Sequence, residues 1–400
     1  MAGPLAGVRV VDLTAMVSGP LGTMWLADQG ADVIKIERPD TGDYTRLAPN
    51  QRHGFSAGFL NNNRNKRSMA LDLSQPAGRE VLLRLVREAD VFVQNFRPGV
   101  IERMGLGEDV IRQHAPDIIY TSVSGFGFTG PYAAKPVYDP LIQALSGLAT
   151  VQAGSDQARP RLVRTILPDK LTGVAMAQAV SAALFARERG APGQHVRVSM
   201  LDAVIAFLWS SDMASQTFAD GDISQAEAAS FIDLIYETAD GGHISVAVQT
   251  DREWEALTRA LDTPDWLDDP RFSTPALRHD NIDERLAMTQ ERLRARGAEE
   301  WLSRLEAEGV PCAPVLTRSQ LLDHPQIAAN AIVVASEHPQ AGPLRQARTP
   351  AVFSATPAER FEGAPGLGAD TRAVLAELGY GDDAIESLVS TDTAGVPPRQ

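Results

Sequence analysis

The chain has a single cysteine, Cys312, among its 400 residues. One cysteine excludes a disulfide within the chain and suits a reducing compartment. No apolar run is long enough to span a bilayer. The opening stretch MAGPLAGVRVVDL also lacks the basic segment that precedes the apolar part of a signal peptide. These absences lead us to expect a cytoplasmic protein without a membrane partner.

Positive charge is in deficit as well, since 37 Lys and Arg stand against 51 Asp and Glu, a net charge of −14. This balance argues against a nucleic acid partner. The deficit is uneven, because residues 1–105 hold 13 Lys and Arg against 11 Asp and Glu. The N-terminal part is therefore the place where an anionic ligand would fit best, although uneven surface charge would give the same count.

Two apparent motifs lack the context that their chemistry requires. GFGFTG at residues 125–130 matches the dinucleotide fingerprint, but Pro131 and Pro136 stand where the phosphate-binding helix would begin. GFSAG at residues 54–58 matches a hydrolase elbow, yet its flanks are polar and loop-like. The seven histidines show no metal-ligand spacing, and Cys312 lies in an apolar strand. We therefore expect no nicotinamide cofactor, no serine or cysteine nucleophile and no metal site.

The first half of the chain alternates strand-like runs with helix-periodic segments. Runs rich in Val and Ile predict strands at residues 8–13, 32–37, 68–73, 90–96 and 117–124. Helical patterns fall between them, at residues 19–30, 76–89 and 107–115. This alternation predicts an α/β fold with a Rossmann-like large domain, in which helices cover a parallel sheet.

The pattern changes near residue 225. LIYETADGGHISVAV predicts a hairpin with its turn at residues 240–242, and three helical segments and the strand GVPCAPV follow it. The tail at residues 369–388 predicts two short helices. We therefore predict a large domain over residues 1–224, a smaller α+β domain over 225–325, and a segment over 326–400 that returns to the large domain.

An acidic residue stands where a long helix of small residues is predicted to begin. The helix covers residues 170–189, with Asp169 at its N-cap and Pro168 fixing the entry of the chain. Aspartate is an ordinary cap, and the helix dipole favours its ionised form. The local pattern therefore leaves two readings of Asp169 open, a cap and a reactive carboxylate.

The order of several short segments resembles the family III CoA-transferases, whose superfamily includes the α-methylacyl-CoA racemases. The segments are LAGVRVVDLT, ADVIKIERPDTGD, NRNKRSMALDL, ADVFVQNFRPGVIERMGLG, SGFGFTGPY, GQHVRVSMLDAV, YETADGG and GVPCAPV. The resemblance implies a large and a small domain in each of two chains, interlocked as a homodimer. It also implies acyl-CoA and small carboxylic acids as partners, with no cofactor beyond coenzyme A itself as substrate and product.

By the same resemblance, Asp169 is the catalytic nucleophile. Its carboxylate would attack an acyl-CoA to give a mixed anhydride, which CoA converts into an aspartyl-CoA thioester that an incoming acid then resolves. Arg38 and Arg103 could form surface salt bridges, but taken together they favour binding of the CoA phosphates. The resemblance places these residues along the CoA molecule: Val17, Ser18, Arg38, Leu71, Asp72, Leu73, Asn95, Phe96, Arg97, Arg103, Val137, Tyr138 and Met200.

Two departures from the family pattern narrow the range of reactions that we expect. The racemases carry a His at the position of Tyr138, and racemisation needs a base on each face of the α-carbon. A CoA-dependent racemase or epimerase is thus the weaker alternative. Residues 219–232 lack the glycine-rich loop of the formyl-CoA transferases, which speaks against oxalate as the acceptor.

Two further questions stay open at this point. A protein that binds CoA without catalysis is a third hypothesis, and the presence of Asp169 argues against it. Arg161 and Arg164 lie just upstream of Asp169. They suit either the second carboxylate of a dicarboxylic substrate or an ordinary surface.

Overall fold

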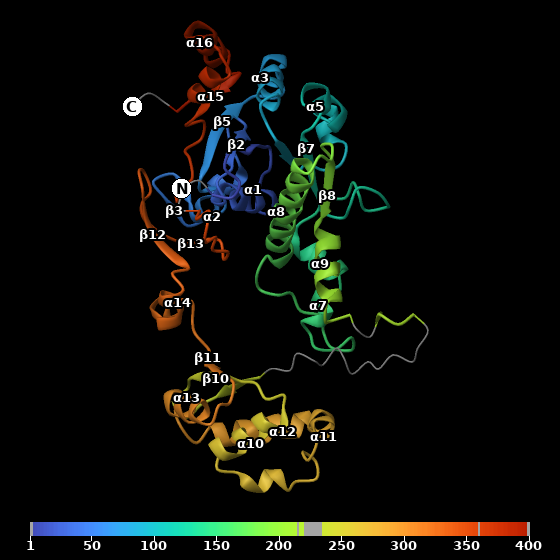
Figure 1. The fold of residues 1–400 in the computed structure, drawn as a ribbon, viewed down its shortest axis with the longest axis vertical. Coiled ribbons are helices and arrows are strands. Elements are labelled where there is room, and N and C mark those ends of the chain that lie inside the picture. Colours follow the sequence, from blue (N-terminus) through green and yellow to red (C-terminus); the bar gives the residue numbers. More distant parts are fainter. Residues whose placement is uncertain (1–2, 214–215, 220–233, 359–360, 398–400) are drawn as a thin grey trace. The chain divides into compact units, whose positions relative to one another are not determined.

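The fold comes from a computed structural model, which describes residues 3–213, 216–219, 234–358 and 361–397 (Figure 1). The chain forms two compact units. One consists of Met1–Ser230 with Ile332–Gln400, and the other of Phe231–Ala331. The predicted domain boundary at residue 225 lies outside the described residues.

A seven-stranded sheet organises the first unit. All of its neighbouring strands pair in parallel except the short pair of β14 with β5. This mixed α/β arrangement with a mostly parallel sheet is the predicted fold class. The strands, in spatial order, are β14 (Ala394–Gly395), β5 (Lys66–Leu71), β2 (Asp32–Glu37), β1 (Arg9–Asp12), β6 (Val91–Gln94), β7 (Ile119–Ser124) and β8 (His195–Ser199).

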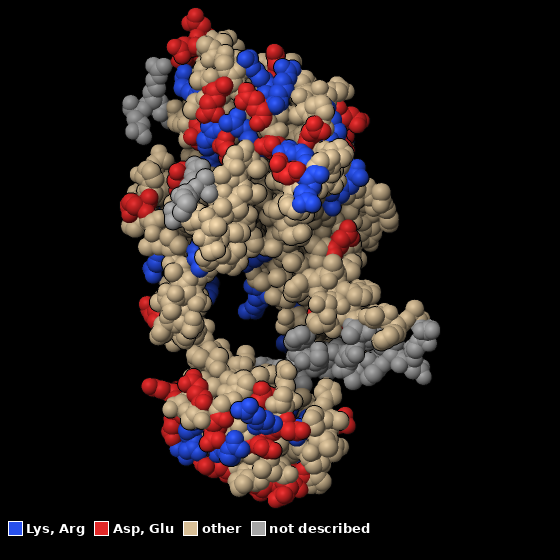
Figure 2. Space-filling model, viewed as in Figure 1, with Lys and Arg blue, Asp and Glu red and all other residues tan. Residues whose placement is uncertain are grey.

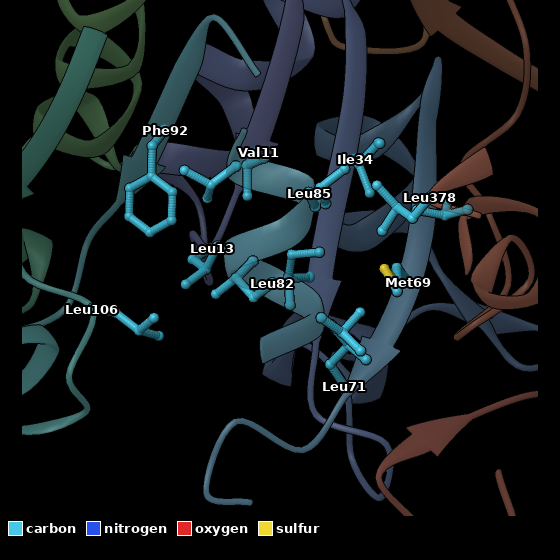
Figure 3. Close-up of a cluster of buried hydrophobic side chains, with 14 of the residues drawn as sticks. Val11, Leu13, Ile34, Met69, Leu71, Leu82, Leu85, Phe92, Leu106 and Leu378 are labelled. Atoms are coloured by element: carbon cyan, nitrogen blue, oxygen red, sulfur yellow. The ribbon is translucent and has the colours of Figure 1, made fainter. Parts of the chain in front are cut away.

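Strands β1, β2, β6 and β7 contribute to two cores, because successive side chains point to opposite faces of the sheet. On one face Val11 and Ile34 pack with Leu82 of α3 (Pro76–Val86), as Figure 3 shows. On the other face Val10 and Val33 pack against α1 (Ser18–Asp28) and α8 (Leu167–Glu188). Burial on both faces explains why these strands are continuous apolar runs in the sequence.

The predicted helices of the first half and the tail are all present. They are α1, α3, α5 (Glu108–His114), α15 (Thr371–Glu377) and α16 (Asp382–Ser390). The other helices of this unit are η1 (Tyr44–Leu47), α2 (Ala57–Asn63), α4 (Val100–Arg103), α6 (Asp139–Leu145), α7 (Leu148–Val151) and α9 (Met200–Trp209). Two hairpins complete it, β3 (Gln51–Arg52) with β4 (Phe55–Ser56) and β12 (Val333–His338) with β13 (Gly342–Ala347). Within the described part of the chain, no helix is long and apolar enough to cross a membrane.

The second unit combines a small antiparallel sheet with helices. The predicted hairpin is β9 (Ile235–Glu237) with β10 (His243–Val246), and the predicted strand at GVPCAPV is β11 (Cys312–Pro314), which pairs with β10. Trp254, Trp266 and Trp301 are the largest side chains of its core. Its helices are α10 (Asp251–Ala260), η4 (Pro264–Leu267), α11 (Pro275–Asp280), α12 (Ile282–Leu293), α13 (Ala298–Ala307), η5 (Gln320–Asp323) and α14 (Pro325–Ala329).

The strand order creates a crevice at one edge of the large sheet. From β1 the chain moves outward to β2 and β5, and then returns to β6 on the other side of β1. The loops that follow β1 and β6 therefore diverge at the carboxyl ends of these strands. In open α/β sheets this switch point is where ligands bind.

Helices α1 and α8 approach each other closely because glycines lie where they cross. A Cβ added at Gly22 of α1 would lie 2.6 Å from the Gly173 carbonyl oxygen. A Cβ added at Gly173 of α8 would lie 2.7 Å from the carbonyl oxygen of Ser18. Backbone atoms cannot rotate away as a flexible side chain can, so this contact brings the first turn of α8 next to the first turn of α1.

We expect Gly173→Ala to lower the free energy of unfolding by about 1–3 kcal/mol, because the added methyl group forces the two helices apart. Gly58→Ala is the matched control, since a Cβ at this helical glycine of α2 meets no atom closer than 3.7 Å. The control should be neutral or more stable by up to ~1 kcal/mol. Urea denaturation of both variants checks this, and equal stabilities would contradict the close packing.

Candidate active site

A cavity of about 190 Å³ lies at the switch point. Its walls come from the loop between β1 and α1, the loop after β6, the end of β7 and the first turns of α6, α8 and α9. The lining residues are Met16, Val17, Ser18, Asn95, Phe96, Arg97, Pro98, Val123, Ser124, Gly125, Ala133, Lys135, Val137, Tyr138, Asp139, Asp169 and Met200.

Nine of the predicted site residues line this single cavity, although they come from separate parts of the chain. They are Val17, Ser18, Asn95, Phe96, Arg97, Val137, Tyr138, Asp169 and Met200. The other five, Arg38, Leu71, Asp72, Leu73 and Arg103, do not line it. Their contacts with CoA stay predictions.

The structure places these five around the same edge of the sheet, at and after the ends of β5, β2 and β6. The Leu71 side chain is 1% exposed and belongs to the core, and Leu73 packs against that core. Arg38 is exposed and pairs with Asp40 at 2.9 Å. Asp72 accepts hydrogen bonds from nearby residues, and Arg103 is exposed at the end of α4.

Asp169 is not the helix cap that its sequence context predicted. Helix α8 begins at Leu167, its N-cap is Ile166, and Asp169 lies inside the first turn. The prediction was wrong because proline is tolerated in the first helical turn, so Pro168 lies within the helix rather than before it. The Asp169 carboxyl is therefore not engaged in capping its own helix and faces the cavity.

A second carboxylate, Asp139, lies beside Asp169. Asp139 is 3% exposed and opens helix α6. Its Oδ1 accepts a hydrogen bond of 2.6 Å from Gln143, and its Oδ2 accepts one of 3.2 Å from the backbone N–H of Asp169. Asp139 thus satisfies a free N–H of α8 and holds its charge near the neighbouring carboxyl group.

The pKa of Asp169 is raised from 3.8 to about 6. Burial is the main cause, and the charge of Asp139 adds to it. The hydroxyl and the N–H of Ser18, which lines the same cavity, favour the ionised form and act in the opposite direction. Because Ser18 is the first residue of α1, the Asp169 carboxyl faces the positive end of that helix. At neutral pH the group is mostly ionised and more basic than an ordinary carboxylate.

Two cations line the cavity without an ion pair to any described residue. Lys135 contacts the Tyr132 ring, with Nζ 3.2 Å from the ring centroid, and Arg97 is exposed. Several cations elsewhere in residues 1–105 form ion pairs, namely Arg9, Lys35, Arg38, Arg46, Arg64, Lys66 and Arg67. Figure 2 shows basic and acidic side chains close together around α3, α15 and α16. Arg67, for example, bridges Asp32 and Glu377. Free positive charge therefore remains at the cavity, where an anionic ligand can use it.

Sequence reasoning missed three lining residues of particular interest. Lys135 and Asp139 are charged, and Met16 has a positive φ of 71°. Lys135 and Asp139 flank the predicted pair Val137 and Tyr138, so the segment was found but its charges were not. Asp139 contacts Asp169 across 30 positions of sequence. A pattern within one helix or strand holds no signal for such a contact.

The structure shows the surroundings of the two rejected motifs. Ser56 is fully buried and caps α2, where it accepts the N–H of Phe59 at 3.0 Å. After β7 the next helix begins only at Asp139, so GFGFTG precedes no helix that could receive a pyrophosphate. Among the described residues, no cluster of three or more His, Cys, Asp or Glu could hold a metal ion. The segment expected to lack a glycine-rich loop, residues 219–232, lies almost wholly outside the described residues.

The raised pKa predicts that Asp169→Asn stabilises the protein at neutral pH. The folded state holds the Asp169 proton more tightly than the unfolded state, so stability falls as pH rises from 3.8 to about 6. Asparagine removes this loss, which we expect to be worth about 1–3 kcal/mol at pH 7. The gain should vanish below about pH 4.

Thermal unfolding of the wild type and the variant at both pH values measures this effect. Asp156→Asn serves as the control, because Asp156 is an exposed loop residue whose neutralisation should change stability by less than ~0.5 kcal/mol. An Asp169→Asn variant that is less stable at pH 7 would contradict the electrostatic strain.

The chain is similar to known proteins along most of its length. The model of CoA-transferase family III matches residues 5–371. Human succinyl-CoA:glutarate CoA-transferase is 33% identical over 399 residues, which cover 97% of this chain and 89% of the relative. Formyl-CoA:oxalate CoA-transferase of Escherichia coli O157:H7 is 33% identical over 414 residues, with 97% and 99% coverage. A CaiB/BaiF family protein from Brucella suis has a TM-score of 0.82 at 30% identity, covering 94% of this chain and 100% of that one.

Proposed function

Because the chain belongs to the family III CoA-transferases, we propose that it moves CoA between carboxylic acids with Asp169 as the covalent nucleophile. One observation carries this assignment. The Asp169 carboxyl lines the switch-point cavity, beside the positive end of α1, with a pKa raised to about 6. Burial, together with the charge of the second carboxylate, Asp139, makes it more basic than an ordinary aspartate.

The proposed exchange proceeds in four steps. An Asp169 oxygen attacks the acyl carbon of the donor and expels CoA thiolate, which forms a mixed anhydride. The thiolate then attacks the Asp169 carbonyl carbon, releasing the donor acid and leaving an aspartyl-CoA thioester. The acceptor carboxylate attacks the same carbon and expels CoA again, and CoA finally takes the new acyl group and frees Asp169.

The surroundings of Asp169 suit both halves of this cycle. A carboxylate with a raised pKa is a stronger nucleophile than an ordinary one, and it is still ionised at neutral pH. The N–H and hydroxyl of Ser18 at the start of α1 are donors for negative charge that develops on the Asp169 oxygens.

The anionic parts of CoA need cations along the crevice. Arg97 and Lys135 line the cavity without ion pairs in the described chain, and we assign them to the charged groups of CoA or of the acid. Arg38 and Arg103 lie outside the cavity, where the nucleotide end would extend. We place the adenine beside residues 71–73 and the pantetheine between Phe96 and Met200.

The racemase alternative lacks a second base. Tyr138 occupies the position of the racemase His and is 68% exposed at the cavity. No His lines the cavity among the described residues. A phenol is a much weaker base than the imidazole it replaces, so we favour transfer over racemisation.

A small dicarboxylic acid is the substrate class that the relatives suggest, since glutarate and oxalate stand in their names. Arg161 and Arg164 are exposed and do not line the cavity. We therefore do not assign them to the second carboxylate. The cations that line the cavity are the groups available for it.

The nucleophile assignment predicts a covalent adduct. Incubation with an acyl-CoA and no acceptor acid should leave CoA or an acyl group on the peptide that contains Asp169. Asp169→Asn should stay folded, form no adduct and lose at least about a thousandfold in kcat, because an amide cannot form the anhydride. Mass spectrometry of digested protein and a steady-state exchange assay measure these effects.

Asp156→Asn is again the control and should retain both the adduct and the activity. An Asp169→Asn enzyme that turns over at more than a few per cent of the wild-type rate would refute the nucleophile.

We also propose that the active form is an interlocked homodimer in the cytoplasm, as the resemblance implies. Sedimentation at low concentration should give about twice the chain mass of 43.0 kDa, with no dissociation short of unfolding. A stable, folded species at the mass of one chain would contradict the interlocked form.

A further inference from the structure

The segment that delivers Ser18 to Asp169 is held by side chains from other elements. It runs from Thr14 to Val17, between the end of β1 and the start of α1. Met16, Val17 and Ser18 all line the cavity. Its conformation therefore decides where the Ser18 donors point.

The first residue, Thr14, is fixed by two charged side chains. Its N–H and hydroxyl donate to Oδ1 of Asp12 at 2.9 and 2.5 Å. Its carbonyl accepts a hydrogen bond of 2.7 Å from Nζ of Lys35. Lys35 comes from the neighbouring strand β2 and is fully buried.

The next two residues are held in the same way. Asn95 forms a reciprocal amide pair with Ala15, accepting its N–H at 3.0 Å and donating to its carbonyl at 2.8 Å. The N–H of Met16 donates to Oδ1 of Asp43 at 3.3 Å. The other oxygen of Asp43 pairs with Lys35 at 3.0 Å. Lys35 and Asp43 together thus hold both ends of the Thr14–Met16 stretch.

Met16 adopts a conformation that a side chain disfavours. Its φ is 71°, in the left-handed region that glycine and asparagine tolerate best. For a residue such as methionine this costs about 1–2 kcal/mol, so neighbouring contacts must hold it there. The hydrogen bond from its N–H to Asp43 is one such contact.

Stability alone is a weak explanation for the buried pair. The side chains of Lys35 and Asp43 are 0% and 1% exposed, and removing two charges from water costs as much as their attraction returns. Lys66 and Asp12 form a second buried pair beside them, at 3.0 Å. Burial opposes the charge on Asp12, but Lys66, Lys35 and two hydroxyls outweigh it and lower its pKa to about 2. Asp12 therefore stays ionised beneath the segment, while burial lowers the pKa of its partner Lys66 to about 8.

We propose that Lys35 and Asp43 are positioning residues for CoA transfer, which hold Met16 in its left-handed conformation so that Ser18 stays against Asp169. The proposal rests on the transferase function proposed above. It adds two buried residues that touch neither the cavity nor the reacting atoms but set the geometry of a group that does.

The pH dependence of kcat/KM distinguishes a positioning role from a purely stabilising one. The informative part is the acid limb, where kcat/KM falls as the pH is lowered. In the wild type this limb should have its midpoint near the Asp169 pKa of about 6. Asp43→Ala releases Met16 and moves the Ser18 donors away from Asp169, so the midpoint should rise by about half a unit to one unit. The charged groups at the cavity, Asp139, Arg97 and Lys135, are unchanged in this variant. We expect kcat to fall by about ten- to a hundredfold as well.

Asp28→Ala is the matched control. Asp28 pairs with buried Arg64 at 2.6 Å, at the opposite end of α1 from Ser18. The Asp28→Ala variant should lose about as much stability as Asp43→Ala, while its acid limb keeps the wild-type midpoint. Where Asp43→Ala does not fold, Lys35→Met/Asp43→Ala removes both buried charges together and should show the same upward shift.

A second substitution tests the backbone conformation directly. Adding Met16→Gly to Asp43→Ala should recover part of the lost kcat, because glycine reaches a positive φ without strain. If Asp43→Ala keeps both the wild-type midpoint of the acid limb and the wild-type kcat, the positioning role is overturned. Failure of the proposed function itself would give a different result, because the Asp169→Asn variant would then still turn over.

Discussion

The contact between α1 and α8 is the constraint on which the rest of the site depends. Gly22 and Gly173 allow the two helix backbones to approach within a distance that no Cβ could occupy. As a result, the first residue of α1 faces a carboxylate in the first turn of α8. Ser18 and Asp169 are 151 positions apart by their numbers, and only this packing brings the donor of one helix to the acid of the other.

The site stores electrostatic strain, which the proposed mechanism would use. Burial and Asp139 both act against the ionised form of Asp169, while Ser18 favours it. The balance leaves a carboxylate that is charged at neutral pH and more basic than an ordinary aspartate, as the proposed attack on a thioester requires. The same arrangement destabilises the fold, which is a common compromise in active sites.

Sequence patterns predicted those features whose cause is local. The five predicted strands are apolar because both faces of the sheet are covered, and the hairpin at residues 240–242 follows from its turn chemistry. Strand β8, with the sequence HVRVS, was not predicted as a strand because its His and Arg break the apolar run at the sheet edge. Asp169 was predicted as a site residue through the family resemblance. The predicted start of its helix was wrong because proline can stand either before a helix or in its first turn.

The interactions that act on Asp169 were not predictable from any local pattern. Asp139 and Ser18 meet it through tertiary packing, and Lys35 and Asp43 act through a loop that neither belongs to. A buried lysine in an apolar strand looks like an interruption of the pattern until its partner is known. Long-range polar contacts of this kind are set by the fold as a whole, so the sequence predicts the site's members better than their roles.

Transfer of oxygen from the acceptor acid to Asp169 is the most direct test of the central claim. In the anhydride cycle the bridging oxygen comes from the acceptor and remains on Asp169 when CoA takes the acyl group. After turnover with an acceptor labelled with heavy oxygen in its carboxylate, the peptide of residues 165–170 should carry that label in the wild type. Turnover that leaves this peptide unlabelled would contradict a covalent role for Asp169.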